Sequence, residues 1–302
     1  MTWTREQWSL AAVLATMVAW GMNFAFVKYV LEHLGFGPFM FIRFVTLPLL
    51  AFALLAVVFR GSIARTWPKR ADLPRFIACG LIGHTAHIAI VMYGMSLSTA
   101  FSSSLVLTSG PIFTLIILAA LGVERLRRRQ IAGTLVAFCG IVLFLGDKFT
   151  RGLAEAGAGD LLLLAAAFLF SLYTVLARPL AERYGPLIVL AYTLLFGAPP
   201  LVLATLPAFI AAPPGGITLA VAFSLFFTIV ISSFFGWLAW SWVNTVRGLA
   251  RCAPFQYLMP PIAGVVAWLT LGEIFTPLKL AGAAVTMAGL AWAQYPAQPD
   301  PA

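Results

Sequence analysis

Two histidines and one arginine stand inside long apolar stretches, where an ionisable side chain is unusual. His84 and His87 are three residues apart, so they share one face of a helix. They could line a polar path or carry a proton, or they could be neutral imidazoles bonded to neighbouring helices. Arg43 stands near the start of its stretch, where it could face an anionic group, extend toward the helix end or pair with another helix. The histidine pair lacks a third and fourth ligand for zinc, so we expect no metal and no cofactor.

A second group of residues alternates indole rings with small polar groups. Ser233, Trp237, Trp240, Ser241 and Asn244 fall on one stripe of a helix. Aromatic rings beside hydrogen-bonding groups suit an amphipathic, aromatic ligand. The same stripe could equally serve packing between helices.

Other polar residues stand at matching places in the two halves of the chain. Trp20 and Asn23 share a helix face, and Tyr173 stands 150 positions after Asn23. Gln256 stands one turn before a double proline, and Ser104 stands at a similar place ahead of a single proline. These side chains could line a cavity between the halves, or they could hold helices together by hydrogen bonds.

The composition indicates what kind of elements must position these residues. Of 302 residues, 62% are hydrophobic and 10% are charged, against about 45–50% and about 25% in soluble domains. The sequence therefore predicts an integral membrane protein whose helices lie in a lipid bilayer. The net charge of +9 does not indicate a nucleic-acid partner, because the basic residues stand between apolar stretches. All ten acids stand at or outside the ends of these stretches.

A bilayer-spanning helix needs about 20 apolar residues, and the chain offers ten candidates. These are Trp8–Val30, Phe39–Phe59, Leu73–Ser96, Ala100–Leu121, Ile131–Leu145, Leu161–Ala177, Pro186–Ile210, Ile217–Val243, Ala253–Leu271 and Leu278–Tyr295. With the N-terminus in the cytoplasm, fourteen basic residues fall on the cytoplasmic side and four on the other: Arg5, Arg60, Arg65, Lys69, Arg70, Arg75, Arg125, Arg127, Arg128, Arg129, Arg178, Arg183, Arg247 and Arg251 against Lys28, Lys148, Arg151 and Lys279. This bias predicts that both termini are cytoplasmic.

The chain repeats itself. Pro111 stands 150 positions before Pro261, and Glu32 stands 150 before Glu182, while Gly140 stands 149 before Gly289. We therefore expect a first five-helix repeat in residues 1–147, a connection in 148–159, a second repeat in 160–295 and a disordered tail in 296–302. Because five is odd, the second copy must enter the membrane from the opposite side, which is an arrangement found in secondary transporters.

Proline and glycine give the repeat its recognisable features. Pro111, Pro260 and Pro261 are expected to kink their helices and to shape a cavity or a hinge. The glycine pairs Gly133/Gly140 and Gly282/Gly289 predict close packing of the fifth and tenth helices.

These features resemble the drug/metabolite transporter superfamily, and specifically its EamA-type branch. The matching motifs are Pro111, Leu121-Gly122-Val123-Glu124 and the first glycine pair, followed by Pro261, Leu271-Gly272-Glu273 and the second pair. Val123 departs from the pattern by separating the acid from the Leu-Gly turn. The resemblance implies an all-α integral membrane protein with ten transmembrane helices in two inverted five-helix repeats, in a bacterial inner membrane.

The same resemblance implies export of small metabolites, with amino acids as the leading substrates. Among the members of this branch, the chain resembles the YddG-type aromatic amino-acid exporters. We expect alternating access without a buried carboxylate relay, because no acid stands inside a span. A multidrug, nucleoside or polyamine carrier is the alternative, and a membrane-embedded enzyme or a helical bundle without a pathway is a remote one. The oligomeric state stays open, with a monomer among the options.

Overall fold

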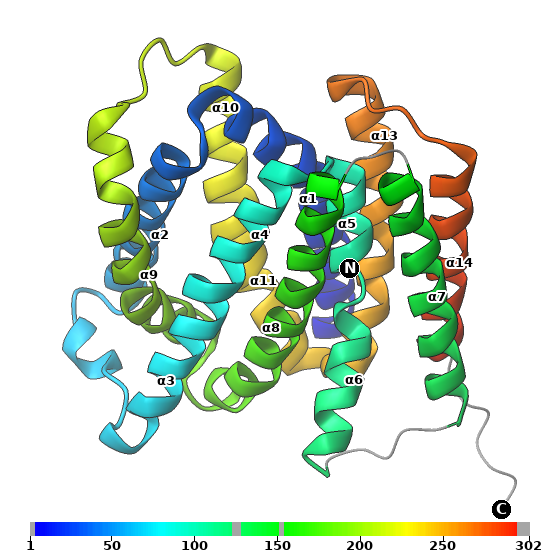
Figure 1. Cartoon of the computed structure of the whole chain (residues 1–302). Helices are drawn as coiled ribbons and strands as arrows, with labels where there is room; N and C mark the ends of the chain where they lie inside the picture. The colour runs from blue at the N-terminus through cyan, green and yellow to red at the C-terminus, as the bar shows by residue number, and fades with distance from the viewer. Residues whose placement is uncertain (1–3, 123–127, 151–153, 295–302) are drawn as a thin grey trace, which may run out of the picture.

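The computed structural model describes residues 4–122, 128–150 and 154–294, and every regular element within these ranges is helical (Figure 1). The α-helices are α1 (Arg5–Leu34), α2 (Phe36–Val58), α3 (Leu73–Cys79), α4 (His87–Leu97), α5 (Ala100–Leu107), α6 (Gly110–Ala120), α7 (Arg128–Thr150), α8 (Ala154–Tyr184), α9 (Pro186–Ala211), α10 (Leu219–Phe226), α11 (Gly236–Arg247), α12 (Leu249–Cys252), α13 (Met259–Leu271) and α14 (Pro277–Gln294). Short 3-10 helices are η1 (Ile63–Thr66), η2 (Arg70–Asp72) and η5 (Ala253–Leu258). Two π-helices, η3 (Gly80–Ala86) and η4 (Phe227–Phe235), join α3 to α4 and α10 to α11.

The helices follow the predicted apolar stretches. Among the described residues, seven helical stretches are long and apolar enough to cross a membrane: Arg5–Leu34, Phe36–Val58, Arg70–Leu97, Ala100–Ala120, Gly157–Tyr184, Pro186–Ala211 and Leu219–Arg247. Ile131–Phe144 and Phe255–Leu271 are shorter apolar helices.

Some helices extend beyond the apolar stretches that predicted them. α7 continues to Thr150 and α8 begins at Ala154, so both enter the segment 148–159 that was expected to be a connection. Charged residues end an apolar run, but they need not end a helix, because glutamate, lysine and arginine are good helix formers. Val123 and Glu124 of the first turn motif and the tail 296–302 lie outside the described residues.

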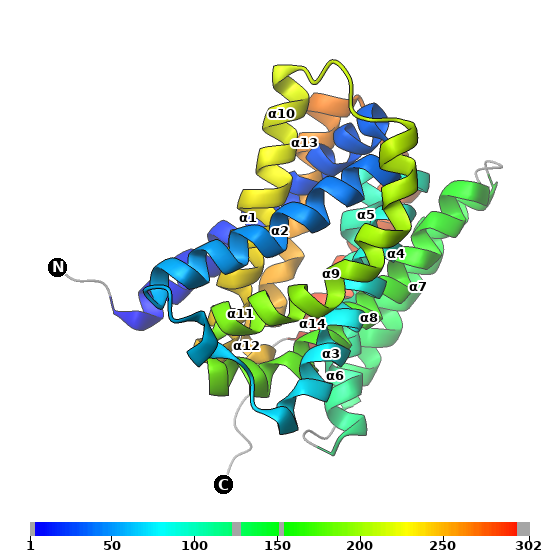
Figure 2. The same cartoon turned by 90° about the vertical axis from the view of Figure 1, so that its left-hand side faces the viewer.

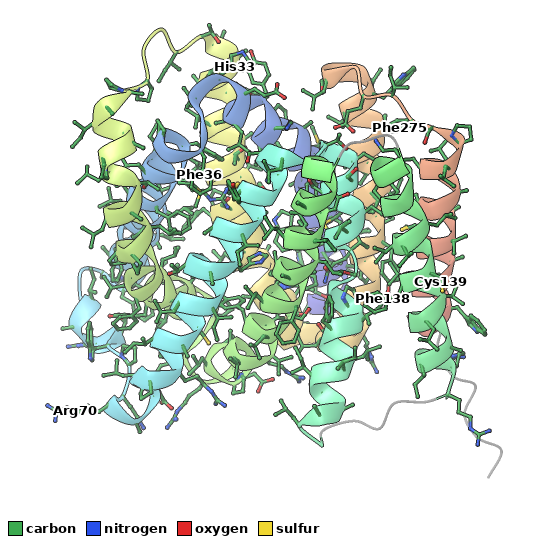
Figure 3. All side chains as sticks on the ribbon, viewed as in Figure 1. His33, Phe36, Arg70, Phe138, Cys139 and Phe275 are labelled. Atoms are coloured by element: carbon green, nitrogen blue, oxygen red, sulfur yellow. The ribbon has the colours of Figure 1, made fainter. Side chains whose placement is uncertain are left out.

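The bundle has two ends, which are identified by the turns between helices. α10 and α13 reach the upper end, and α3 and α6 reach the lower end, in two perpendicular views (Figures 1 and 2). His33 lies at the upper end, whereas Arg70 lies at the lower end and points away from the bundle (Figure 3). Helices from different halves of the chain pack together: α1 against α11 and α13, α8 against α4 and α6, α2 against α9, and α7 against α14.

The glycines of α7 and α14 bring the two backbones into contact, as expected for packing. A Cβ at Gly140 would lie 2.4 Å from the backbone nitrogen of Thr286, and one at Gly289 would lie 2.4 Å from that of Ala137. A separation this short leaves no room for a side chain. These glycines therefore join the last helix of each half rather than line a cavity.

The prolines begin helices instead of bending continuous ones. α5 ends at Leu107, and α6 begins at Gly110 with Pro111 in its first turn. Pro260 and Pro261 stand in the first turn of α13, directly after η5. Proline fits a first turn because its missing N–H would have no partner within the helix. The predicted kinks are thus breaks, which leave irregular backbone between two helical segments.

Candidate functional site

A cavity lies in the upper half of the bundle, and both halves of the chain form its walls. It opens partly to the surface and has about 100 Å³ of space for the centres of water-sized molecules. The lining residues are Trp20, Asn23, Phe24, Arg43, His87, Ile88, Val91, Met92, Met95, Leu107, Ala167, Phe170, Ser232, Ser233, Trp237, Gln256 and Met259. Residues from α1, α2, α4, α5, α8, η4, α11, η5 and α13 therefore meet here, and we call this space the upper cavity.

Arg43 is the charged residue of the upper cavity. Its side chain is only 3% exposed, and its Nε and Nη1 atoms have no hydrogen-bond partner. The guanidinium carbon lies 6.0 Å from the ring centroid of Phe39. No aspartate or glutamate among the described residues lines the cavity. A buried guanidinium without an acid is costly unless an anion reaches it.

Two side-chain amides share the cavity with Arg43. The Oδ1 atom of Asn23 is buried and has no hydrogen-bond partner. Gln256 is buried on η5, just ahead of the α13 prolines. Both were predicted as pathway residues, and the structure places both on the wall of the upper cavity.

Aromatic side chains line the same cavity as these polar groups. The ring centroids of Trp20 and Phe170 lie 6.1 Å apart, and those of Phe170 and Trp237 lie 5.8 Å apart. The indole N–H of Trp20 donates to the carbonyl oxygen of Ser232 at 2.9 Å, where the π-helix η4 frees a carbonyl. This hydrogen bond fixes the indole of Trp20 against the wall.

The two histidines satisfy their hydrogen bonds separately. His87 donates from Nδ1 to the carbonyl oxygen of Ala166 at 2.9 Å, and this carbonyl can only accept. His84 lies 3.0 Å from Thr193 through Nε2 and Oγ1. Because the Thr193 hydroxyl already donates to the carbonyl of Val189, it is the histidine that donates here. His87 lines the upper cavity, whereas His84 lies beside a smaller cavity with Arg43, Ser233 and Trp237.

Trp237 separates the upper cavity from a second cavity below it. The lower cavity is lined by Tyr173, Thr174, Ala177, Arg178, Ala181, Trp237, Trp240, Ser241, Asn244 and Thr245. Its residues come from the lower ends of α8 and α11, which finish at Tyr184 and Arg247. The indole of Trp237 packs 4.7 Å from His84 and 5.2 Å from Tyr173 between ring centroids. The predicted stripe on α11 thus faces both cavities, with Trp237 between them.

Some predicted site residues lie elsewhere, and some lining residues were not predicted. Ser104 is buried inside α5 and donates to the carbonyl of Phe101, away from the cavities. Met92, Met95 and Phe170 line the upper cavity without having been predicted. Phe170 had a detectable signal, because it stands 150 positions after Trp20 in the repeat.

One buried acid lies inside an apolar span of the described residues, against the expectation from the sequence. Asp160 is fully buried within the span Gly157–Tyr184 and accepts a hydrogen bond from Ser98. The expectation was wrong because α8 begins earlier than the apolar run that predicted it. Asp160 does not line either cavity.

Comparison with known proteins places this architecture in a family. The model of the EamA-like transporter family matches the chain twice, over residues 7–146 and 157–294. The chain is 29% identical over 282 residues to a "Probable terminal-alkyne amino-acid exporter" of Streptantibioticus cattleyicolor, covering 92% of this chain and 91% of the relative. It is 27% identical over 288 residues to a "Probable amino-acid metabolite efflux pump" of Salmonella typhimurium, with coverage of 92% and 91%.

A solved structure agrees with the fold. One crystal structure of a protein aligns over 96% of this chain and 98% of its own length, with a TM-score of 0.63 and 18% sequence identity. At that identity the likeness concerns the fold alone. Because the family match covers nearly the whole chain in two parts, this multi-pass membrane protein, a transporter and not an enzyme, belongs to the EamA-like transporter family of the drug/metabolite transporter superfamily.

Proposed function

We propose that the protein is a secondary transporter that exports small amphipathic metabolites, with amino acids, including aromatic ones, as the leading class. The observation that carries this proposal is the upper cavity, whose lining combines an unpaired Arg43 with the aromatic rings of Trp20 and Phe170. A substrate carboxylate can bind the guanidinium, while an apolar side chain packs on Trp20 and Phe170. Relatives named as amino-acid exporters and efflux pumps support the same class.

The transporter would consist of ten membrane helices in two inverted repeats, residues 1–147 and 160–295. The double family match supports this division. The turn glycines Gly35 and Gly185 stand 150 positions apart and have φ angles of 73° and 84°. Gly122 and Gly272 repeat this relation with φ angles of 70° and 65°. The helix partners also exchange, since α1 packs against α11 and α13 as α8 packs against α4 and α6.

In this proposal the chain sits in a bacterial inner membrane with both termini in the cytoplasm. The upper end, with His33, then faces the outside, and the lower end faces the cytoplasm. The upper cavity is on the outer side of Trp237 and the lower cavity is on its inner side. Movement of the two halves about Trp237 would give alternating access, with substrate entering from the cytoplasm through the lower cavity.

Transport would proceed without a buried carboxylate relay. A proton-coupled carrier that uses such a relay places an acid on its substrate path, and the described lining of both cavities holds none. Counterflow in proteoliposomes tests this directly. Exchange should proceed at equal pH on both sides, and a strict requirement for an imposed pH gradient would contradict the proposal.

The same assay decides the substrate class. Labelled aromatic and aliphatic amino acids should exchange, and nucleosides and polyamines should not. A polyamine carrier is disfavoured because the guanidinium of Arg43 would repel a polycation in the upper cavity. Exchange of polyamines or of cationic drugs, without exchange of any amino acid or related carboxylate, would favour the multidrug alternative.

A further inference from the structure

We propose that the upper cavity recognises a monoanion, namely a carboxylate that carries a neutral N–H donor and an aromatic or large apolar side chain. N-acylated amino acids are the class with this chemistry. The inference rests on the proposed transport function and deepens it, because it states which charge form of an amino-acid-like molecule fits.

The described wall of the upper cavity is positively charged. Arg43 contributes a guanidinium that is 3% exposed, and two of its nitrogens have no partner. The other polar side-chain groups of the described lining are amides, hydroxyls, an imidazole and two indole N–H groups, none of which is an acid. The Nδ1 atom of His87 donates a hydrogen bond to the backbone carbonyl of Ala166. This nitrogen therefore cannot accept a hydrogen bond from the guanidinium of Arg43. The described wall of the upper cavity therefore carries one uncompensated positive charge.

A bound zwitterion would have an ammonium group without a partner in the upper cavity. Its carboxylate can bind Arg43, but its ammonium finds no aspartate or glutamate on the described wall. The ammonium would also lie in the positive field of the guanidinium, within a space of low dielectric constant. A monoanion leaves the filled cavity neutral, whereas a zwitterion leaves it with the charge of Arg43. A cation would add a second positive charge.

The upper cavity also contains a hydrogen-bond acceptor without a donor. Asn23 presents a buried Oδ1 atom without a partner, on the helix that also carries Trp20. The indole N–H of Trp20 is already bonded to Ser232, so it cannot satisfy this oxygen. An amide N–H from the bound molecule can satisfy it and brings no charge. This is the group that acylation leaves on the nitrogen of an amino acid.

Four probes that share one benzyl side chain separate these features. N-acetylphenylalanine has a carboxylate and a neutral N–H, 3-phenylpropionate has the carboxylate alone, phenylalanine is a zwitterion and phenethylamine is a cation. Binding is measured as the rise in the thermal unfolding midpoint of the purified full-length protein in detergent. Transport is measured as competition in counterflow. N-acetylphenylalanine should bind about tenfold more tightly than phenylalanine, with 3-phenylpropionate between them and phenethylamine without effect.

Three variants test the residues. Arg43→Gln should abolish the preference for anions and should raise the unfolding midpoint of the unliganded protein, because it removes a buried unpaired charge. Arg43→Lys keeps the charge and should retain part of the preference. Asn23→Ala should bring N-acetylphenylalanine down to the level of 3-phenylpropionate. Arg70→Gln is the matched control, because Arg70 is exposed at the lower end (Figure 3).

The outcomes separate this inference from the proposed function. Tighter binding of phenylalanine than of N-acetylphenylalanine, or an anion preference that survives Arg43→Gln, would overturn the inference and leave an amino-acid transporter. Absence of both binding and counterflow for all four probes, together with all amino acids, would overturn both. If the Arg43→Gln protein does not fold, the binding order of the four probes in the wild-type protein tests the inference.

Discussion

At the scale of single residues, Trp237 lines both of the cavities that we propose as the transport path. It lines the upper cavity, the lower cavity and the small cavity beside His84, and its side chain is 9% exposed. Trp237→Ala should join the two main cavities and weaken the aromatic cluster, which lowers the free energy of unfolding by about 3–5 kcal/mol. We expect counterflow to lose selectivity among substrates, as measured by competition in proteoliposomes.

Two further variants make this prediction specific. Trp237→Phe keeps a ring between the cavities and should retain most of the selectivity with a smaller loss of stability. Trp268→Ala changes a tryptophan of α13 that is 61% exposed on the outer face, so it should alter neither property. Wild-type selectivity in a folded Trp237→Ala protein would remove Trp237 from the path.

At the scale of elements, apolar length predicts where the helices are but not how they are wound. The ten apolar stretches locate the helices because a bilayer requires runs of this length. The π-helices η3 and η4 were not predicted, although they lie near equivalent places in the two halves. A π-helix depends on partners for the carbonyls that it frees, as the indole of Trp20 serves the carbonyl of Ser232 in η4. This partner comes from another helix, so no local pattern reveals it.

The close contact between α7 and α14 predicts that a large side chain at Gly289 destabilises the protein. Gly289→Leu places a side chain where even a Cβ would lie 2.4 Å from the backbone of Ala137. The two helices must then move apart, and we expect a loss of about 1–3 kcal/mol from the strain. Thermal unfolding in detergent measures it. Ala288→Leu, at the neighbouring exposed position of α14, is the control and should be neutral. Equal midpoints for the two variants would contradict close packing here.

At the scale of the whole molecule, local chemistry predicted more of the candidate site than the repeat did. Asn23, Arg43 and Gln256 could be predicted because polar groups inside apolar spans are rare. Met92 and Met95 could not, because an apolar side chain that lines a cavity looks the same in sequence as one that faces lipid. Ser104 was predicted by analogy between the halves, but its hydroxyl is used within its own helix, as serine often does.

The proposed inverted relation of the two repeats can be tested by labelling. Glu32 and Glu182 stand 150 positions apart, are both exposed, and lie at the upper and lower ends of α1 and α8. Cysteine is placed at either position in a background with Cys139→Ala, since Cys139 is the exposed native cysteine among the described residues. An inverted repeat puts equivalent positions on opposite faces of the membrane. In spheroplasts, a membrane-impermeant maleimide should label Glu32→Cys directly and Glu182→Cys only after permeabilisation. Labelling of both from one side would mean that the repeats are parallel, and the alternating-access scheme about Trp237 would fail with them.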